Sequence, residues 1–344
     1  MRVLVTGGAG FIGSHYVRSL LGGAYPGWEG ARVTVLDKLT YAGNLANLAP
    51  VADHRGHTFV RGDIADARLL AEVVPGHDVV VNFAAESHVD RSIADAGDFV
   101  TTNVLGTQRL LQAALEAGVR TFVQVSTDEV YGSIAEGSWD EDAPLLPNSP
   151  YSAAKASGDL LCRAYARTHG LDVRVTRCSN NYGPYQYPEK VVPLFVTNLI
   201  DGRPVPLYGD GRNVREWLHV DDHCRGVQLV LEKGSPGEVY NIGGGVELTN
   251  LELTERLLSI SGAGWDMVVR VPDRPGHDLR YSVDSGKIRS LGYEPRVDFG
   301  EGLAEVVQWY RDHQEWWRPA RRAASVSSVP ESEQGEPWTH PTFR

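Results

Sequence analysis

The chain has 344 residues, of which 42% are hydrophobic and 22% charged, as is usual for a globular protein with a sizeable core. Its 33 Lys and Arg against 44 Asp and Glu give a formal charge of −11, which disfavours nucleic acid and anionic membranes as partners, so that an anionic ligand would require a local basic pocket. Three widely spaced cysteines, with neither a secretory leader nor a long apolar run, predict a cytoplasmic protein without a membrane span.

Short apolar runs alternate with amphipathic segments through the first half of the chain. This alternation predicts an α/β fold of the Rossmann-like, doubly wound type, in which helices cover both faces of a parallel sheet. Ligands of such sheets bind beyond the carboxyl ends of the strands. The predicted strands are 1–6, 32–36, 58–61, 78–83, 121–126 and 173–177, and two of the predicted helices are 103–117 and 152–168.

After residue 178 the elements become shorter, and prolines, glycines and aromatic residues become more frequent. We expect a larger domain in residues 1–178, to which later segments return, and a smaller ligand-binding lobe in residues 179–317. A last amphipathic helix is predicted at 302–313, and the paired Trp316 and Trp317 are expected to close the core. The Ser/Glu/Pro-rich composition that follows predicts a disordered tail at 318–344.

A glycine-rich loop, Gly7-Gly-Ala-Gly10-Phe-Ile-Gly13, lies between the first predicted strand and a helix. In this context the glycines allow a tight turn and a close approach to a pyrophosphate, which the helix N-terminus also favours. Asp37 ends the next strand, where a carboxylate binds both ribose hydroxyls and repels a 2′-phosphate, so NAD is favoured over NADP despite the neighbouring Lys38. Asp63 follows another strand and is either an adenine contact or part of an ordinary turn.

Tyr151 and Lys155 stand four residues apart at the start of a predicted helix. This spacing places the phenol and the ammonium on one face, where the cation is expected to lower the tyrosine pKa from about 10 toward neutrality. Tyr151 then becomes a possible general base for a sugar hydroxyl. Thr127 ends the strand before this helix and is a candidate hydrogen-bond partner of the same hydroxyl.

Two acids, Asp128 and Glu129, follow Thr127 directly. Adjacent acids at the end of a strand are commonly solvated loop residues, but here the predicted sheet directs them toward the ligand. Two carboxyl groups in a partly dry site can have divergent pKa values, so that one serves as an acid and the other as a base.

At these residues the sequence resembles the dTDP-glucose 4,6-dehydratases of the extended short-chain dehydrogenase/reductase family, which belong to deoxysugar biosynthesis. The resemblance extends from Arg2 to about Trp317. The stretches that carry it are 6–14, 37–44 (Asp-Lys-Leu-Thr-Tyr-Ala-Gly-Asn), 84–92 (Ala-Ala-Glu-Ser-His-Val-Asp-Arg-Ser), 126–132, 179–185 (Ser-Asn-Asn-Tyr-Gly-Pro-Tyr), 208–211, 215–217 and 273–278.

The resemblance implies NAD as a tightly bound cofactor and a dTDP-sugar as the substrate. Besides the three loop glycines, the implied cofactor positions are Phe11, Ile12, Asp37, Lys38, Leu39, Thr40, Asp63, Ile64, Ala84, Ala85, Glu86, Ser87, Thr102, Tyr151, Lys155 and Asn181. The implied substrate positions are Ser87, Thr127, Asn180, Lys190, Val191, Pro206, Leu207, Tyr208, Arg215, Asn250, Asp273, Arg274 and His277. Lys190 and Arg215 would supply the local positive charge.

The resemblance also implies a reaction sequence for the catalytic residues Thr127, Asp128, Glu129, Tyr151 and Lys155. Tyr151 would take the 4-hydroxyl proton during oxidation by NAD, Glu129 would remove the C5 proton, and Asp128 would protonate the departing 6-hydroxyl. The product would be a 4-keto-6-deoxy sugar, and NAD would be regenerated in each turnover.

Helices 103–117 and 152–168 resemble the pair through which relatives form homodimers. Their apolar residues Val104, Leu111 and Leu115 would lie at that interface or, alternatively, pack on the sheet.

Two other functions share part of this pattern. A nucleotide-sugar 4-epimerase needs the glycine loop and the Tyr/Lys pair but no couple such as Asp128 and Glu129. A non-catalytic NAD-binding protein would not need Tyr151 or Lys155. His219 and His223 are spaced like metal ligands, but no third ligand is evident, so no metal site is predicted.

Overall fold

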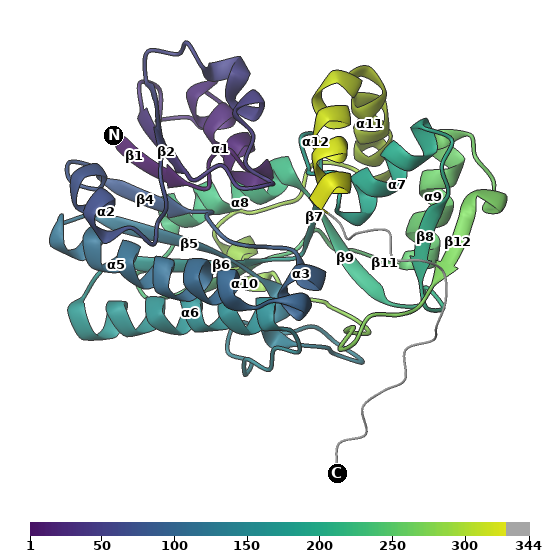
Figure 1. Ribbon diagram of the computed structural model, residues 1–344. Coiled ribbons are helices and arrows are strands. Elements are labelled where there is room, and N and C mark those ends of the chain that lie inside the picture. Colours follow the sequence, from purple (N-terminus) through teal and green to yellow (C-terminus); the bar gives the residue numbers. More distant parts are fainter. Residues whose placement is uncertain (328–344) are drawn as a thin grey trace.

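A seven-stranded parallel sheet forms the centre of the larger part of the computed structural model, which describes residues 1–327 (Figure 1). All six strands predicted in the first half are present, with ends within two residues of those expected. A seventh strand comes from the second half of the chain. The strands, in spatial order, are β10 (Val239–Ile242), β6 (Val173–Cys178), β5 (Thr121–Thr127), β4 (Val79–Asn82), β1 (Arg2–Thr6), β2 (Arg32–Asp37) and β3 (His57–Arg61).

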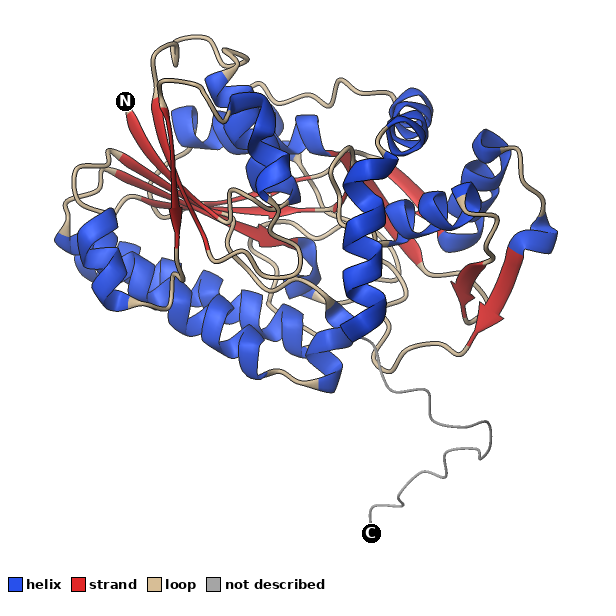
Figure 2. Cartoon of the chain, turned by 45° about the horizontal axis from the view of Figure 1, so that its top comes forward, coloured by secondary structure: helices blue, strands red, loops and turns tan. Residues whose placement is uncertain are grey.

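Two helical layers cover the sheet, because successive side chains of each buried strand point to opposite faces. In β1, Val3 and Val5 face one layer and Leu4 faces the other. The first layer contains α1 (Phe11–Leu21), η1 (Leu45–Val51), α8 (Val220–Lys233) and α10 (Gly286–Ser290), and the second contains α2 (Ala67–Val73), α5 (Thr107–Glu116) and α6 (Pro150–His169) (Figure 2).

The helix predicted at 103–117 is present, but it begins earlier and changes its hydrogen-bond pattern along its length. Its first part belongs to η2 (Val100–Gly106), a π-helical segment, and its second part is α5. Two short helices, α3 (Val89–Ala94) and α4 (Gly97–Phe99), precede it. The four-residue turn η3 (Asp128–Tyr131) follows β5 directly and carries both acids singled out in the sequence.

The smaller lobe has its own apolar core, which includes the aromatic side chains of Tyr182, Trp217, Phe299 and Trp317. Trp317 is fully buried, as predicted. The lobe contains the strands β7 (Asn180–Tyr182), β8 (Val205–Tyr208), β9 (Val214–His219), β11 (Val246–Thr249) and β12 (Val268–Val271), and the helices α7 (Val191–Ile200), α9 (Asn250–Ser261), η4 (Trp265–Met267) and α11 (Phe299–Asp312).

The predicted tail does not begin at residue 318, because helix α12 (Gln314–Ser327) continues through this position. Polar contacts hold the first part of α12 on the lobe. Arg318 and Arg321 both pair with Asp201, and the hydroxyl of Tyr187 donates to the carbonyl of Ala320. The rest of the predicted tail, residues 328–344, lies outside the described residues.

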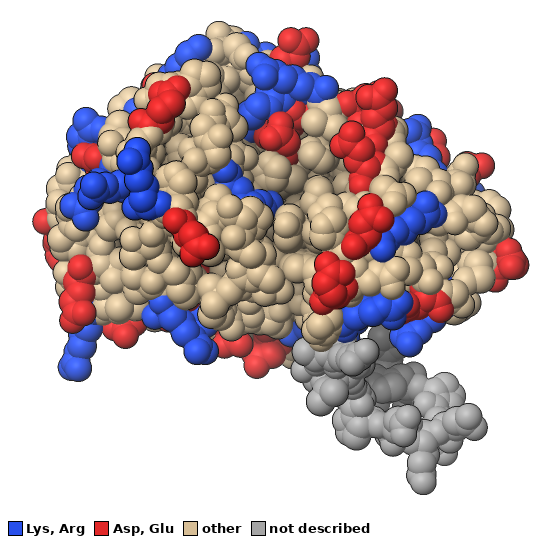
Figure 3. Space-filling view, turned by 90° about the horizontal axis from the view of Figure 1, so that it is seen from above, with Lys and Arg blue, Asp and Glu red and all other residues tan. Residues whose placement is uncertain are grey.

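Basic and acidic side chains are interspersed on the face shown in Figure 3. Within residues 1–327, no helix combines the length and the apolar character that crossing a bilayer requires.

Candidate active site

A cavity of about 440 Å³ lies where the carboxyl ends of β1 to β6 meet the smaller lobe. Almost all of the site residues predicted from the sequence line it. Three do not: Leu39 and Asp273 lie outside the lining, and Leu207 is buried in the core of the lobe. The two groups of predicted residues, those for a cofactor and those for a substrate, therefore share one continuous space.

The glycine loop forms a close-packed cradle at one end of the cavity. Gly7 has a φ of +66°, and a side chain there would place its Cβ 2.5 Å from the backbone nitrogen of Ala84. A Cβ at Gly13 would lie 2.4 Å from the carbonyl oxygen of Gly7. Because no side chain caps α1 at Gly10, the N–H groups of its first turn remain available to an anion. This cradle fits the pyrophosphate of a dinucleotide.

Asp37 ends β2 beside this cradle, and burial raises the pKa of its carboxyl. Its oxygens accept hydrogen bonds from the backbone N–H groups of Ala9 and Leu39, at 2.9 and 2.8 Å. Lys38 points to a different set of acceptors, with its Nζ 3.0 Å from Thr102 Oγ1 and 3.5 Å from Glu86 Oε1. The positive charge beside Asp37 is therefore partly neutralised within the protein, in keeping with an unphosphorylated ribose.

Tyr151 and Lys155 lie near the start of α6, whose first turn is stabilised by a capping box between Ser149 and Ser152. Lys155 donates from Nζ to the carbonyl oxygen of Val125, at 2.6 Å. Burial, and then the nearby carboxyl of Glu129, raise the pKa of Tyr151 well above its ordinary value. The expected lowering of this pKa is therefore absent, because the ammonium is directed to the backbone of β5 and the phenol lies in a dry, acidic environment.

Asp128 and Glu129 lie in the same cavity as Tyr151, on the short turn η3. Burial, and then the neighbouring Glu129, hold the pKa of Asp128 well above its usual range. Burial also raises the pKa of Glu129, but the charges of Arg215 and Lys190 oppose that rise. The two carboxyl groups therefore lie in different electrostatic environments, with positive charge directed at Glu129 and a neighbouring carboxyl at Asp128.

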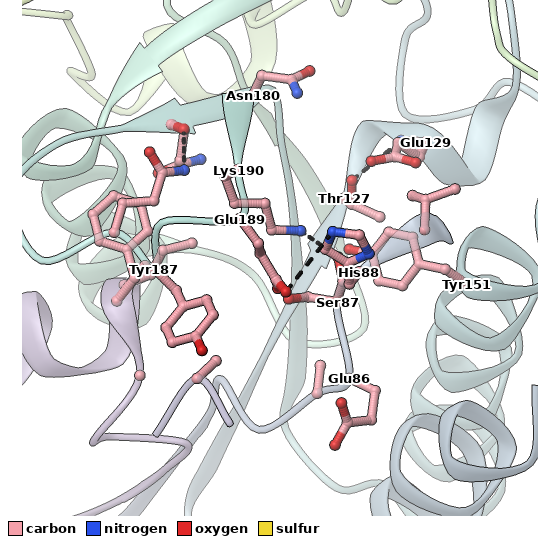
Figure 4. Close-up of a pocket in the computed structure, with 18 of the residues that line it drawn as sticks. Glu86, Ser87, His88, Thr127, Glu129, Tyr151, Asn180, Tyr187, Glu189 and Lys190 are labelled. Carbon is pink, nitrogen blue, oxygen red and sulfur yellow. Dashed lines mark hydrogen bonds and ion pairs between the residues drawn. The ribbon is translucent and has the colours of Figure 1, made fainter. Parts of the chain in front are cut away.

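Several cationic side chains line the cavity. Figure 4 shows Thr127, Glu129 and Tyr151 on one side, with Lys190 reaching in from the other. Lys190 donates from Nζ to the carbonyl oxygen of Ser87, at 2.5 Å. Arg215 and Arg274 also line the cavity, so the basic pocket required by an acidic protein with an anionic ligand is present.

Several lining residues were not singled out in the sequence. Glu189 lies 3.3 Å from a guanidinium nitrogen of Arg91 and 3.8 Å from Nε2 of His88, and burial raises the pKa of its carboxyl (Figure 4). Asp278 accepts a hydrogen bond from Arg215 through its backbone carbonyl, at 3.0 Å, and the ring of Tyr281 lies under the same guanidinium. One feature of the sequence could have indicated such residues. Lys190 and Arg215 were predicted to enter a buried site, and buried cations need acidic, carbonyl or aromatic partners nearby.

The two histidines at metal-like spacing have other contacts. His219 caps α8, and its Nδ1 accepts from the backbone N–H of Asp221 at 3.3 Å. His223 is buried against Asn181 Oδ1, at 2.9 Å, and burial lowers its pKa to about 3. In the described part of the chain, no three His, Cys, Asp or Glu side chains are grouped in a way that could hold a metal ion.

Comparisons with known proteins agree with this geometry. The family model described as GDP-mannose 4,6 dehydratase matches residues 4–306. A dTDP-glucose 4,6-dehydratase of Streptomyces niveus is 63% identical over 96% of this chain and 98% of its own length. A second such enzyme, from Streptomyces antibioticus, is 64% identical over the same shares of the two chains.

Solved structures are also similar. The dTDP-glucose 4,6-dehydratase DesIV of Streptomyces venezuelae, determined with NAD and dTDP bound, is 65% identical and superimposes with a TM-score of 0.92 over 93% of this chain and all of its own. A UDP-glucose 4-epimerase of Thermotoga maritima, determined with UDP-glucose, is 34% identical, with a TM-score of 0.84 over 91% of this chain and all of its own. The chain therefore belongs to the dTDP-glucose 4,6-dehydratase family.

Proposed function

We propose that this protein is an NAD-dependent hydro-lyase that converts dTDP-glucose to dTDP-4-keto-6-deoxyglucose and water. One observation carries the choice of reaction: Asp128 and Glu129 lie in the same buried cavity as Tyr151 and Lys155. An epimerase of the same fold needs only the second pair, since it oxidises and reduces C4 without eliminating water. The names of the relatives support the same assignment and also the dTDP group.

The cradle formed by Gly7, Gly10 and Gly13 would hold the diphosphate of NAD, with Asp37 at the adenosine ribose. Bound there, NAD would supply the hydride acceptor for oxidation at C4 and the hydride donor for reduction at C6. Relatives of this family have been crystallised with NAD. The positive nicotinamide would also oppose the raised pKa of Tyr151, since a nearby cation favours the phenolate.

The chain's own residues would move the protons. Tyr151 takes the proton of the 4-hydroxyl, while Thr127 holds that hydroxyl in position. The resulting ketone acidifies the C5 proton, which Glu129 removes, and Asp128 protonates the departing 6-hydroxyl. Glu129 then returns a proton to C5. Lys190, Arg215 and Arg274 supply positive charge for the diphosphate of the substrate.

Isotope transfer tests this proposal directly. With dTDP-glucose deuterated at C4, we expect the label at C6 of a product that has lost water, as measured by mass spectrometry and NMR. Retention of the label at an inverted C4 would indicate an epimerase instead. No turnover of any nucleotide sugar would contradict both assignments. Tyr151→Phe is the matched control, because it removes the base without changing the ring, and it should abolish transfer of the label.

A homodimer is a further part of the proposal. Exposed apolar side chains lie along η2 and α6, where Val100, Leu105 and Leu160 are 53%, 40% and 53% exposed. Leu111, one of the residues expected at the interface, instead packs on the sheet and is fully buried. A second copy with the same two elements would cover the exposed residues.

The oligomeric state tests the dimer. Light scattering after gel filtration should give twice the chain mass of 37.7 kDa for the wild type and the chain mass for Leu160→Asp. Val269→Asp is a suitable control, since Val269 is similarly exposed on the smaller lobe. A monomeric wild type would contradict the proposal.

A cytoplasmic location is also proposed. It is supported by the three cysteines, which are all free and buried.

A further inference from the structure

The acid turn η3 has a second set of contacts, directed away from the cavity. Its last residue, Tyr131, is fully buried. The Tyr131 hydroxyl donates to Asn241 Oδ1 at 2.8 Å and accepts from Arg177 Nη1 at 2.8 Å. None of these three residues lines the cavity, whereas Asp128 and Glu129 at the other end of the same turn do.

Arg177 extends this contact to the helix that carries the other catalytic pair. Its Nε lies 2.9 Å from Asp159 Oδ2, and its guanidinium lies over the ring of Tyr131, 4.8 Å from the centroid. Asp159 is four residues after Lys155 and eight after Tyr151 on α6, so the three side chains share one face of the helix. A continuous buried chain of hydrogen bonds thus joins α6 to the acid turn through β6.

These hydrogen bonds fix the orientations of the side chains that they join more than they add to the stability of the fold. A buried ion pair contributes little net stability compared with apolar side chains of the same volume. The planar guanidinium nevertheless fixes the positions of both of its partners. The Tyr131 hydroxyl uses its donor and an acceptor position, so its orientation is determined from two sides.

The acid turn needs such a support because it is too short to hold itself in place. It has four residues, and its own cap is the Thr127 side chain, which accepts from the backbone N–H of Glu129 at 3.3 Å. Thr127 is itself expected to contact the substrate. The end of the turn that includes Tyr131 lies outside the cavity and can provide a fixed point that does not move when the sugar binds.

We propose that Tyr131 and Arg177 are positioning residues for the elimination step, which hold the carboxyl groups of Glu129 and Asp128 in place against the sugar once its C4 has been oxidised. This inference rests on the proposed dehydratase function. It assigns to two residues outside the cavity a role in the second half of the reaction and not in the first.

The test measures the two halves separately in single turnovers of the holoenzyme with dTDP-glucose. Oxidation at C4 is followed by the absorbance of the reduced cofactor, and elimination by the mass of the quenched sugar. In Tyr131→Phe we expect an unchanged oxidation rate and a rate of water loss about 10- to 100-fold lower, because small misplacements of reacting groups have effects of this size. A 4-keto sugar that retains its 6-hydroxyl should accumulate. Arg177→Lys should have the same effect.

Tyr165→Phe is the matched control. The Tyr165 hydroxyl also accepts one hydrogen bond and donates another, from Gln108 and to Gln112, and it does not line the cavity. The ratio of the two rates should stay at the wild-type value in this variant. Equal losses in both rates for Tyr131→Phe, or no loss of elimination, would overturn the proposal.

Two further outcomes are distinguishable. If Tyr131→Phe failed to fold, the same ratio would be measured in Asn241→Ser, which removes one hydrogen bond to the hydroxyl and leaves the pair of Arg177 and Asp159 intact. An unchanged ratio there would count against the proposal. Failure of the dehydratase function itself would be seen in the wild type, which would then form no dehydrated sugar.

Discussion

The two catalytic pairs are carried by elements of opposite construction. Tyr151 and Lys155 lie on α6, a helix of 20 residues that begins with a capping box and ends at the left-handed Gly170. Asp128 and Glu129 lie on a turn of four residues without any periodicity of its own. Local hydrogen bonds hold the backbone that carries the first pair, whereas contacts with distant parts of the chain hold the backbone that carries the second. Elimination should therefore be the more easily disturbed half of the reaction.

The largest expected effect separates the two pairs directly. In Glu129→Gln, oxidation at C4 should continue, but water loss should fall about 10²- to 10⁴-fold, because the amide cannot accept the C5 proton. Quenched single turnovers analysed by mass spectrometry give both rates. Glu232→Gln serves as the control, since Glu232 lies outside the cavity and accepts from Gln228. Loss of oxidation by the same factor would show that the pairs do not act separately.

Two glycines with similar φ but different ψ, −166° at Gly132 and 17° at Gly170, sharpen the comparison. Gly132, after the acid turn, has a φ of +77°, and Gly170, after α6, has a φ of +71°. A Cβ at Gly132 would lie 2.3 Å from the carbonyl oxygen of Leu146, whereas nothing lies within 4 Å of one at Gly170.

Substitution of each of these glycines by alanine should reveal the difference. Gly170→Ala should lower the free energy of unfolding by about 1–2 kcal/mol, the cost of the left-handed conformation alone. Gly132→Ala should lower it by a further 1–3 kcal/mol or so and also slow water loss, because the turn must shift. Urea unfolding and the single-turnover assay measure these effects. Equal stability of the two variants would contradict this explanation.

The smallest expected effect is on the stability of the fold, which the burial of Asp128 in the acid turn lowers at neutral pH. Because the pKa of Asp128 is raised in the folded protein, its contribution to stability is present below the unfolded pKa of about 4 and is lost as the pH rises from there. Asp128→Asn should remove this loss. The variant should match the wild type in stability below about pH 4 and become the more stable of the two as the pH rises toward neutral.

Thermal unfolding across this pH range measures the difference between Asp128→Asn and the wild type. A difference that did not change with pH would mean that Asp128 is not protonated in the fold. The same variant should be slow in elimination, so that stability and activity change in opposite directions at this position.

Local and repetitive signals in the sequence were sufficient for most of the fold. The six strands of the first half and the spacing of Tyr151 and Lys155 follow from alternation and helical periodicity. The strand β10 carried no such signal, because its sequence Val-Tyr-Asn-Ile is neither a continuous apolar run nor a strict alternation of apolar and polar residues. The helical continuation beyond Arg318 was missed because its contacts with Asp201 join residues far apart in the sequence.

The residues that line the site were easier to predict from the sequence than the pKa values of those residues. The spacing of Tyr151 and Lys155 suggested a lowered tyrosine pKa, but the direction of an ammonium and the dryness of a cavity depend on the tertiary structure. Glu189 and His88 were missed as a pair for a related reason, because they belong to different elements and meet only when the lobe packs on the sheet.

The position of β10 also has a consequence for the order in which the protein assembles during synthesis. This strand forms the edge of the sheet beside β6, and it supplies Asn241, yet it is translated long after the other six strands. A nascent chain that ends before β10 would expose the β6 edge, which is a site for wrong pairing. We expect the ribosome-bound intermediate to have a nearly complete nucleotide cradle before its acid turn is anchored.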